Sequence, residues 1–242
     1  MKIKYSVSII CAVILGTGLT GCGSGSSIIG TGAGTSTEPY FRAKSEPWRR
    51  SSEMSCLQSG TVARASFIKE DTSARARSGL GAPRICGAVR PLEVMATAGG
   101  AIRLEPRAVL RCPMVPVLDN WSRNVVQPAA FRIYGEPVVS YKILSSYSCR
   151  PRNNKHGAKL SEHGYANAID IGSFSLASGR VVTLKKGWRS GGQDQAFLRH
   201  IHKRACDSFT TVLGPNADKH HADHFHLDLA RHGKKGTYHY CR

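Results

Sequence analysis

The chain has 242 residues, of which 34 are Lys or Arg and 16 are Asp or Glu, so its formal net charge is +18. Hydrophobic residues make up 41% of the chain and charged residues 21%, which supports a buried core and excludes disorder throughout. The length suits one compact domain with extensions. The strongly apolar run at the N-terminus is short, which excludes a polytopic membrane protein.

The first 21 residues have the layout of a secretory signal peptide, because Lys2 and Lys4 precede a short apolar run and a cleavage site with small residues. Residues 19–22, Leu-Thr-Gly-Cys, resemble the bacterial lipobox. We therefore expect cleavage before Cys22 and a lipid anchor on its thiol that holds the protein to the membrane. The alternative is an ordinary signal peptide, and either case predicts export to the periplasm. Gly23 in place of Asp favours the outer over the inner membrane.

Residues 22–50 are rich in Gly, Ser and Thr, which predicts a lipidated, flexible tether before a folded domain at 51–242. Apolar periodicity and β-branched runs predict the elements of that domain. In chain order these are a helical segment at 52–68, a polar loop at 72–81, a helix at 113–126 that Gln127-Pro128 stops, a strand at 138–144, a helix at 194–209 and a strand at 210–213. Helices and strands that do not alternate strictly predict an α+β fold, with a small antiparallel sheet flanked by helices.

The chain has eight cysteines, of which Cys11 lies in the signal and Cys22 is the predicted anchor. Six cysteines in an exported domain predict three disulfides. No two of the six lie closer than 26 positions, which excludes a zinc ribbon. The sequence does not choose among the possible connectivities, and pairing of sequence neighbours (56–86, 112–149, 206–241) is only a guess. The six are Cys56, Cys86, Cys112, Cys149, Cys206 and Cys241.

Two polar segments, 161–170 and 223–228, carry the candidate chemistry. A strand conformation of the second places His224, His226 and Asp228 on one face and the apolar residues between them on the other. In the first, Asp170 alternates with isoleucines on a strand whose other face is buried, and His163 lies shortly before it. Zinc catalysis requires three imidazole or carboxylate ligands and one open position. His163, Asp170 and one histidine of the pair supply that set, and the remaining polar group is free to act as a base toward water.

These motifs resemble two groups of proteins. Ser161 with His163-x6-Asp170, together with His224-x-His226, is similar to the zinc peptidases that include lysostaphin, D-Ala-D-Ala dipeptidases and carboxypeptidases and the penicillin-insensitive murein endopeptidase. The stretch from Cys86 to Cys241 more closely resembles the bacterial extensin-like C-terminal domain family. The motifs that carry this resemblance are Arg111-Cys112-Pro113, Trp121, Pro128-Ala129-Ala130, Tyr147-Ser148-Cys149-Arg150, Ser161-Glu162-His163, Ala168-Ile169-Asp170-Ile171, Ala205-Cys206, Val212-Leu213-Gly214-Pro215 and Asp223-His224-Phe225-His226.

The likeness to the zinc peptidases implies that His163, Asp170 and His226 bind Zn²⁺ and that His224 assists water or steadies the transition state. Asp223 competes with His224 for this role, because the D-Ala-D-Ala peptidases carry a glutamate three positions before their last ligand. On an ideal strand Asp223 faces away from His226, which makes His224 the first choice. A bulge would reverse the order.

The same likeness suggests a role for an arginine ahead of the His-x6-Asp motif. Arg150 occupies that place, where a guanidinium can bind the substrate carbonyl and its developing oxyanion. Arg152 is two positions away and is the alternative. Ala166 departs from the pattern, which has Gly three residues after the first histidine, so we expect the turn there to be built differently.

An exported zinc peptidase of this kind implies peptidoglycan as the substrate, with hydrolysis of an amide bond in the stem peptide or the D,D cross-link. The positive charge fits stem peptides, which carry free carboxylates. The rival hypothesis is a non-catalytic lipoprotein that keeps the fold and binds cell-wall or envelope polymer. Export and the lack of a recognisable motif argue against nucleic acid as a partner. The sequence leaves open the bond cleaved, endopeptidase or carboxypeptidase action, and whether a protein activator opens the site.

Overall fold

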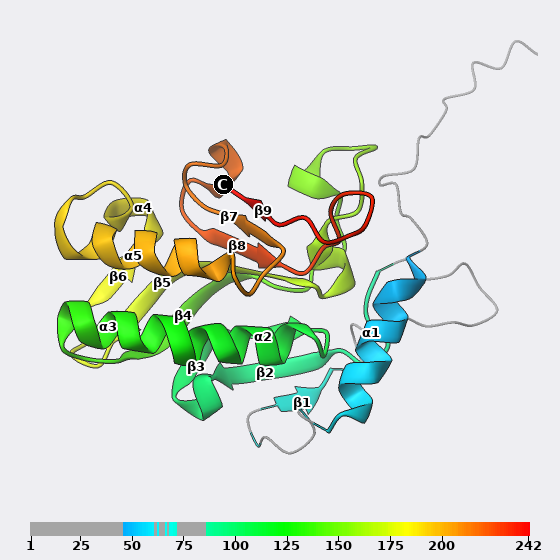
Figure 1. Ribbon diagram of the computed structural model, residues 1–242, viewed down its shortest axis with the longest axis horizontal. Helices are drawn as coiled ribbons and strands as arrows, with labels where there is room; N and C mark the ends of the chain where they lie inside the picture. Colours follow the sequence, from blue (N-terminus) through cyan, green and yellow to red (C-terminus); the bar gives the residue numbers. More distant parts are fainter. Residues whose placement is uncertain (1–45, 61, 63–65, 67, 72–85) are drawn as a thin grey trace, which may run out of the picture. The chain divides into compact units, whose positions relative to one another are not determined.

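The computed structural model describes residues 46–60, 62, 66, 68–71 and 86–242, which belong to one compact unit, Thr37–Arg242 (Figure 1). The predicted signal, the anchor at Cys22, most of the tether and the loop at 72–81 lie outside the described residues. None of the helices in the described ranges combines the length and hydrophobicity needed to cross a membrane.

The described strands form one sheet of nine, and the predicted α+β class is confirmed. The sheet is mixed, so the expected small, purely antiparallel sheet is wrong: β3 pairs with β4 and β7 with β9 in parallel. The long helical connection from β3 to β4 returns the chain to the same end of the sheet, which is what parallel pairing requires. The order is β1 (Ile68–Glu70), β2 (Leu92–Thr97), β3 (Ile102–Leu110), β4 (Val138–Ser145), β5 (Ala168–Leu176), β8 (Phe225–Asp228), β7 (Thr211–Leu213) and β9 (Tyr240–Cys241), with β6 (Val181–Thr183) beside β5.

The core lies between the sheet and the helices. The helices of the described part are α1 (Pro47–Gln58), α2 (Met114–Trp121), α3 (Gln127–Tyr134), α4 (Leu184–Gly187) and α5 (Gly192–Ala205). In Figure 1, α2 and α3 form one nearly continuous rod beside α5. The Trp121 indole of α2 donates to the Ile201 carbonyl of α5 at 3.1 Å. Large aromatic side chains fill the space beneath: Trp121, Tyr141, Phe174, Phe197, Phe209 and Phe225 are fully buried.

The helix that was expected to stop at Gln127-Pro128 continues to Tyr134. Pro128 has no amide hydrogen, and its ring would clash with a carbonyl one turn back in a regular helix. A π turn over Ser122–Val126 removes this conflict, because the wider turn lets the Gln127 N–H reach the Ser122 carbonyl. The rod ends at Gly135, whose φ of 76° suits glycine.

The other predicted elements are found with shifted ends. The strands at 138–144 and 210–213 correspond to β4 and β7, and the helix at 194–209 corresponds to α5. Phe209 lies beyond α5 but is fully buried, as the spacing required. The segment at 52–68 differs most, since α1 runs from Pro47 to Gln58. The last four residues of the predicted tether therefore form the first turn of α1.

Three disulfides are present in the described part of the chain, and the neighbour pairings 56–86 and 112–149 are wrong. Cys56 pairs with Cys112, Cys86 with Cys149 and Cys206 with Cys241, at Cα separations of 5.9, 5.6 and 6.1 Å. The first pairing follows from the docking of α1, where Glu53 lies 3.4 Å from Arg111, directly before Cys112. Cys86 instead lies beside the turn at 161–166, because the N–H of the next residue, Gly87, donates to the Gly164 carbonyl in that turn.

Candidate metal centre

The register of the sheet brings Asp170 and His226 together. β5 and β8 are antiparallel neighbours, and Asp170 lies directly opposite His226. Phe225 and Leu227, on either side of His226, are fully buried in the core. Their burial fixes the face from which His226 projects, because successive side chains of a strand point to opposite faces. The predicted alternation is therefore confirmed for His226 and Asp228, whereas His224 lies just before β8, which begins at Phe225.

His163 reaches the same point from a short 3₁₀ turn, Glu162–Tyr165, that precedes β5. The turn is fastened to the domain, since the Ser148 N–H donates to the His163 carbonyl at 3.2 Å. Ala166 closes the turn with φ 52° and ψ 29°. This left-handed region favours glycine and costs another residue about 1 kcal/mol. Alanine thus adopts here the conformation for which glycine is best suited.

The ligand atoms of His163, Asp170 and His226 all lie within 4.8 Å of one another. His163 Nε2 is 3.1 Å from Asp170 Oδ2 and 3.1 Å from His226 Nδ1, and His226 Nδ1 is 2.8 Å from Asp170 Oδ1. Tetrahedral zinc with bonds of about 2.0–2.1 Å holds its ligand atoms about 3.3 Å apart. All three residues are buried. Two imidazole nitrogens that face each other beside a carboxylate need a shared proton or a cation, so this donor set suits a metal ion.

Each imidazole is oriented through its other ring nitrogen. His163 Nδ1 lies 2.5 Å from the Ser146 carbonyl, to which it donates, so Nε2 is the ring nitrogen that faces Asp170. His226 Nε2 donates to Asp228 Oδ2 at 3.0 Å. Nδ1 is therefore the ring nitrogen that can bind a metal. Asp228 is itself buried and accepts the Ala230 N–H at 2.8 Å. Carbonyl and carboxylate partners of this kind are typical of histidines that bind metals.

Hydrogen bonds between carboxylates and imidazoles shift the pKa values of these groups. Burial by itself would raise the pKa of Asp170, but hydrogen bonds from His163 and His226 outweigh it and hold that pKa far below its usual range. Burial would lower the pKa of His226, but Asp170 and Asp228 raise it to about 10. A divalent cation must therefore displace a proton from His226, which makes metal binding dependent on pH.

Two histidine–aspartate pairs stand beside the three donors. His224 Nε2 lies 3.8 Å from Asp170 Oδ1, and its Nδ1 lies 2.9 Å from Asp223 Oδ1. Asp223 is therefore on the far side of the His224 ring from Asp170. The second pair, missed in the sequence, joins His221 Nδ1 to Asp218 at 2.8 Å. The His221 ring centroid is 5.3 Å from that of His224.

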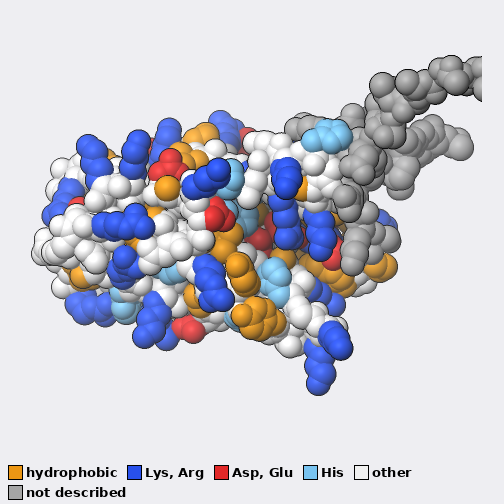
Figure 2. Space-filling model, turned by 90° about the horizontal axis from the view of Figure 1, so that it is seen from above, with side chains coloured by type: hydrophobic (Ala, Val, Ile, Leu, Met, Phe, Trp, Pro, Cys, Tyr) orange, Lys and Arg blue, Asp and Glu red, His pale blue; other side chains and the backbone are white. Residues whose placement is uncertain are grey.

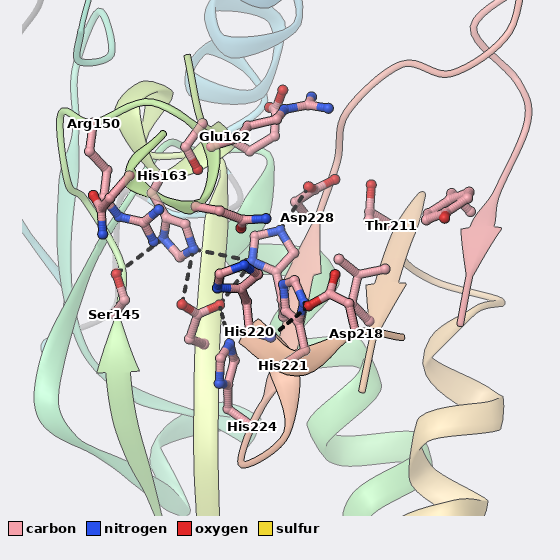
Figure 3. A pocket seen from close by; sticks show the side chains of 18 of the residues that line it. Ser145, Arg150, Glu162, His163, Thr211, Asp218, His220, His221, His224 and Asp228 are labelled. Atoms are coloured by element: carbon pink, nitrogen blue, oxygen red, sulfur yellow. Dashed lines mark hydrogen bonds and ion pairs between the residues drawn. The ribbon is translucent and has the colours of Figure 1, made fainter. Parts of the chain in front are cut away.

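The three donors line an open pocket of about 500 Å³. Arg150 and Arg152, the two candidates for carbonyl binding, both line it on the loop that follows β4. In Figure 3, Arg150 and Ser145 lie on the same side of the pocket as His163. Neither arginine forms an ion pair with a carboxylate among the residues that the structure describes. Their charge is thus available to a ligand in the pocket.

A buried ion pair joins the ligand turn to α1. Glu162, directly before His163, accepts hydrogen bonds from both terminal nitrogens of Arg49 at 2.7 and 2.8 Å, and from Asn167 Nδ2 at 2.7 Å. The same guanidinium lies 4.0 Å from the ring centroid of Tyr165. Arg49 falls within the predicted tether, and no role was expected for Glu162. The available signal was an acidic residue directly before a predicted metal ligand, because a carboxylate buried at such a position requires a cation.

Together these features define an α+β domain whose sheet carries a two-histidine, one-aspartate group able to hold a metal ion beside an open pocket. Residues 55–242 match the family model described as Extensin-like protein C-terminus. The match covers most of the chain, and the protein belongs to this family, as the motifs from Cys86 to Cys241 indicated. No curated protein and no solved structure matches the chain.

Proposed function

We propose that this protein is a zinc-dependent peptidoglycan hydrolase that cleaves an amide bond in the stem peptide or the D,D cross-link. The observation that carries the proposal is the convergence of His163, Asp170 and His226 at nearly the spacing that zinc requires. Structural zinc sites close the ion off with four protein ligands, whereas catalytic sites use three and leave a position for water or substrate. The adjoining pocket of about 500 Å³ provides that opening.

Zinc held by these three residues would polarise a substrate carbonyl and lower the pKa of water toward about 7. His224 is the base, and it takes the proton of the attacking water and returns it to the leaving amine. Asp223, at 2.9 Å from His224 Nδ1, orients the ring. Arg150 lines the pocket and stabilises the negative charge that develops on the carbonyl oxygen.

Charge and cysteine usage support an exported enzyme that acts on an anionic polymer. Figure 2 shows many Lys and Arg side chains spread over the described part of this face, with few acidic ones among them. The net charge of +18 falls to +16 when Lys2 and Lys4 leave with the predicted signal, and it still favours approach to stem peptides with free carboxylates. Three disulfides are typical of proteins outside the cytosol. With the lipobox at Cys22, these features favour a lipid-anchored protein of the periplasm, on the outer membrane.

The proposal is tested by zinc content and by mass spectrometry of muropeptides after digestion. Wild-type protein should hold one zinc per chain and release new products, and His226→Ala should lose both. His200→Ala changes a histidine of α5 that does not line the metal pocket; it is the matched control and should keep both. Stoichiometric zinc with no products would contradict the hydrolase and favour the non-catalytic wall-binding lipoprotein. A folded, oxidised wild type without zinc would refute the metal site.

A further inference from the structure

A second hollow adjoins the metal pocket. Its volume is about 300 Å³, and it is lined by α1, the loop that follows β4 and the segment after β8. Arg152, Glu162 and His232 line both hollows, so the two share a wall along the ligand turn. An extended molecule bound at the metal centre can therefore reach the second hollow along the protein surface.

The second hollow has an excess of unpaired positive charge. Its two carboxylates, Glu46 and Glu162, both bind Arg49: Arg49 Nε donates to Glu46 at 2.7 Å, and the terminal nitrogens donate to Glu162. Three further cations line the hollow, are exposed, and form no ion pair with a carboxylate in the described ranges of the chain. These three cations are Arg152, Lys159 and Arg231.

Like charges around a concave surface favour an anion between them, because the walls concentrate the field. Guanidinium groups bind planar carboxylates through two parallel hydrogen bonds. Arg231 is held in place for such contact, since its guanidinium lies over the ring of Trp48, 4.9 Å from the centroid. Arg152 faces both hollows, so it can bind the same ligand that the metal pocket holds.

We propose that this hollow is a carboxylate-binding subsite for the substrate, an inference that rests on the proposed function. It binds a free carboxylate on the part of the peptide that extends past Glu162 while the scissile amide lies at His163, Asp170 and His226. The substrate class is therefore an anionic peptide with a carboxylate away from the cleaved bond. Peptides whose carboxylates are amidated are poor substrates.

Charge reversal tests the subsite. The subsite variants are Lys159→Glu and Arg231→Glu. Lys155→Glu is the control for the first and Lys235→Glu for the second, since each makes the same change of charge on the same loop. Neither control residue lines either hollow. With cross-linked muropeptides that carry free carboxylates, each subsite variant should raise KM about tenfold, the effect of one charge-assisted hydrogen bond, and leave kcat unchanged. With amidated muropeptides the variants and wild type should have equal KM. If the subsite variants and their controls have the same KM for muropeptides with free carboxylates, the proposed subsite is wrong.

A binding measurement separates the subsite from the hydrolase. Chelator-treated protein is titrated calorimetrically with the same muropeptides, so that no cleavage occurs. If binding is weakened about tenfold in Lys159→Glu while zinc-loaded wild type cleaves nothing, the hydrolase fails and the subsite stands. If zinc-loaded wild type cleaves and the chelated Lys159→Glu protein binds as tightly as Lys155→Glu, the subsite fails and the hydrolase stands.

Discussion

Arg49→Gln should destabilise the domain strongly, because it removes the cation that neutralises Glu162. The side chains of Arg49 and Glu162 are only 10% and 5% exposed. Their bidentate contact leaves the carboxylate with Asn167 as its remaining side-chain partner once Arg49 is shortened. Loss of one partner from a buried ion pair costs about 3–5 kcal/mol. At about 2–4 °C per kcal/mol for a domain of this size, Tm should fall by roughly 10 °C.

Thermal unfolding followed by circular dichroism, with the disulfides oxidised, measures this loss. Arg50→Gln is the matched control, since Arg50 is the next residue of α1 and is exposed. It should change the unfolding free energy by no more than about 0.5 kcal/mol. The double variant with Glu162→Gln should recover part of the loss, because no uncompensated charge is then left. Equal Tm values for Arg49→Gln and Arg50→Gln would refute the assigned role of the ion pair.

Three further predictions follow from single contacts. Ala166→Gly should keep or raise Tm, because relief of about 1 kcal/mol of left-handed backbone strain offsets the added freedom of the unfolded chain. Ala166→Val should instead lower the unfolding free energy by about 2 kcal/mol. Equal thermal stability of the two variants would contradict the strain at this position. Asp228→Asn should weaken zinc binding about 10–100-fold in a chelator competition assay, and an unchanged affinity would show that Asp228 does not orient His226. Burial, together with the charge of Arg199, lowers the pKa of His202 to about 4 against a hydrogen bond to the Arg242 carbonyl that raises it. In the unfolded chain His202 binds a proton near pH 6.5, whereas in the folded protein it stays neutral until about pH 4. The unfolding free energy therefore falls as pH drops from about 6.5 to 4, by about 2 kcal/mol after allowance for partial exposure of the ring. His202→Gln should remove that part of the slope in denaturant unfolding across this pH range, and an identical slope would contradict the shift.

The grouping of the candidate metal ligands could be predicted from the sequence because it follows local rules. The alternation around His226 and Asp170 depends only on the two faces of a strand, and the burial of Phe225 and Leu227 settles which face is which. Their direct pairing across β5 and β8 requires in addition that the two strands be neighbours in this register. Helix α5 was predicted for a similar reason, since its buried residues recur at helical spacing.

The support of the site could not be predicted, because it rests on contacts between segments far apart in the chain. Helix α1 docks through Arg49 and Glu53, so it lacks the apolar stripe by which an amphipathic helix is recognised. The two unexpected disulfides depend on where α1 and the segment at Cys86 lie, which spacing alone does not give. Pro128 usually ends a helix, and only the wider turn before it allows the rod to continue.

X-ray absorption at the zinc edge of the oxidised protein tests the central claim most directly. The predicted result is one zinc per chain, bound by two imidazole nitrogens and by oxygen at about 2.0–2.2 Å with no sulfur, and lost in His226→Ala. Zinc–sulfur scattering, or a site that survives His226→Ala, would place the metal elsewhere and contradict the assignment of His163, Asp170 and His226.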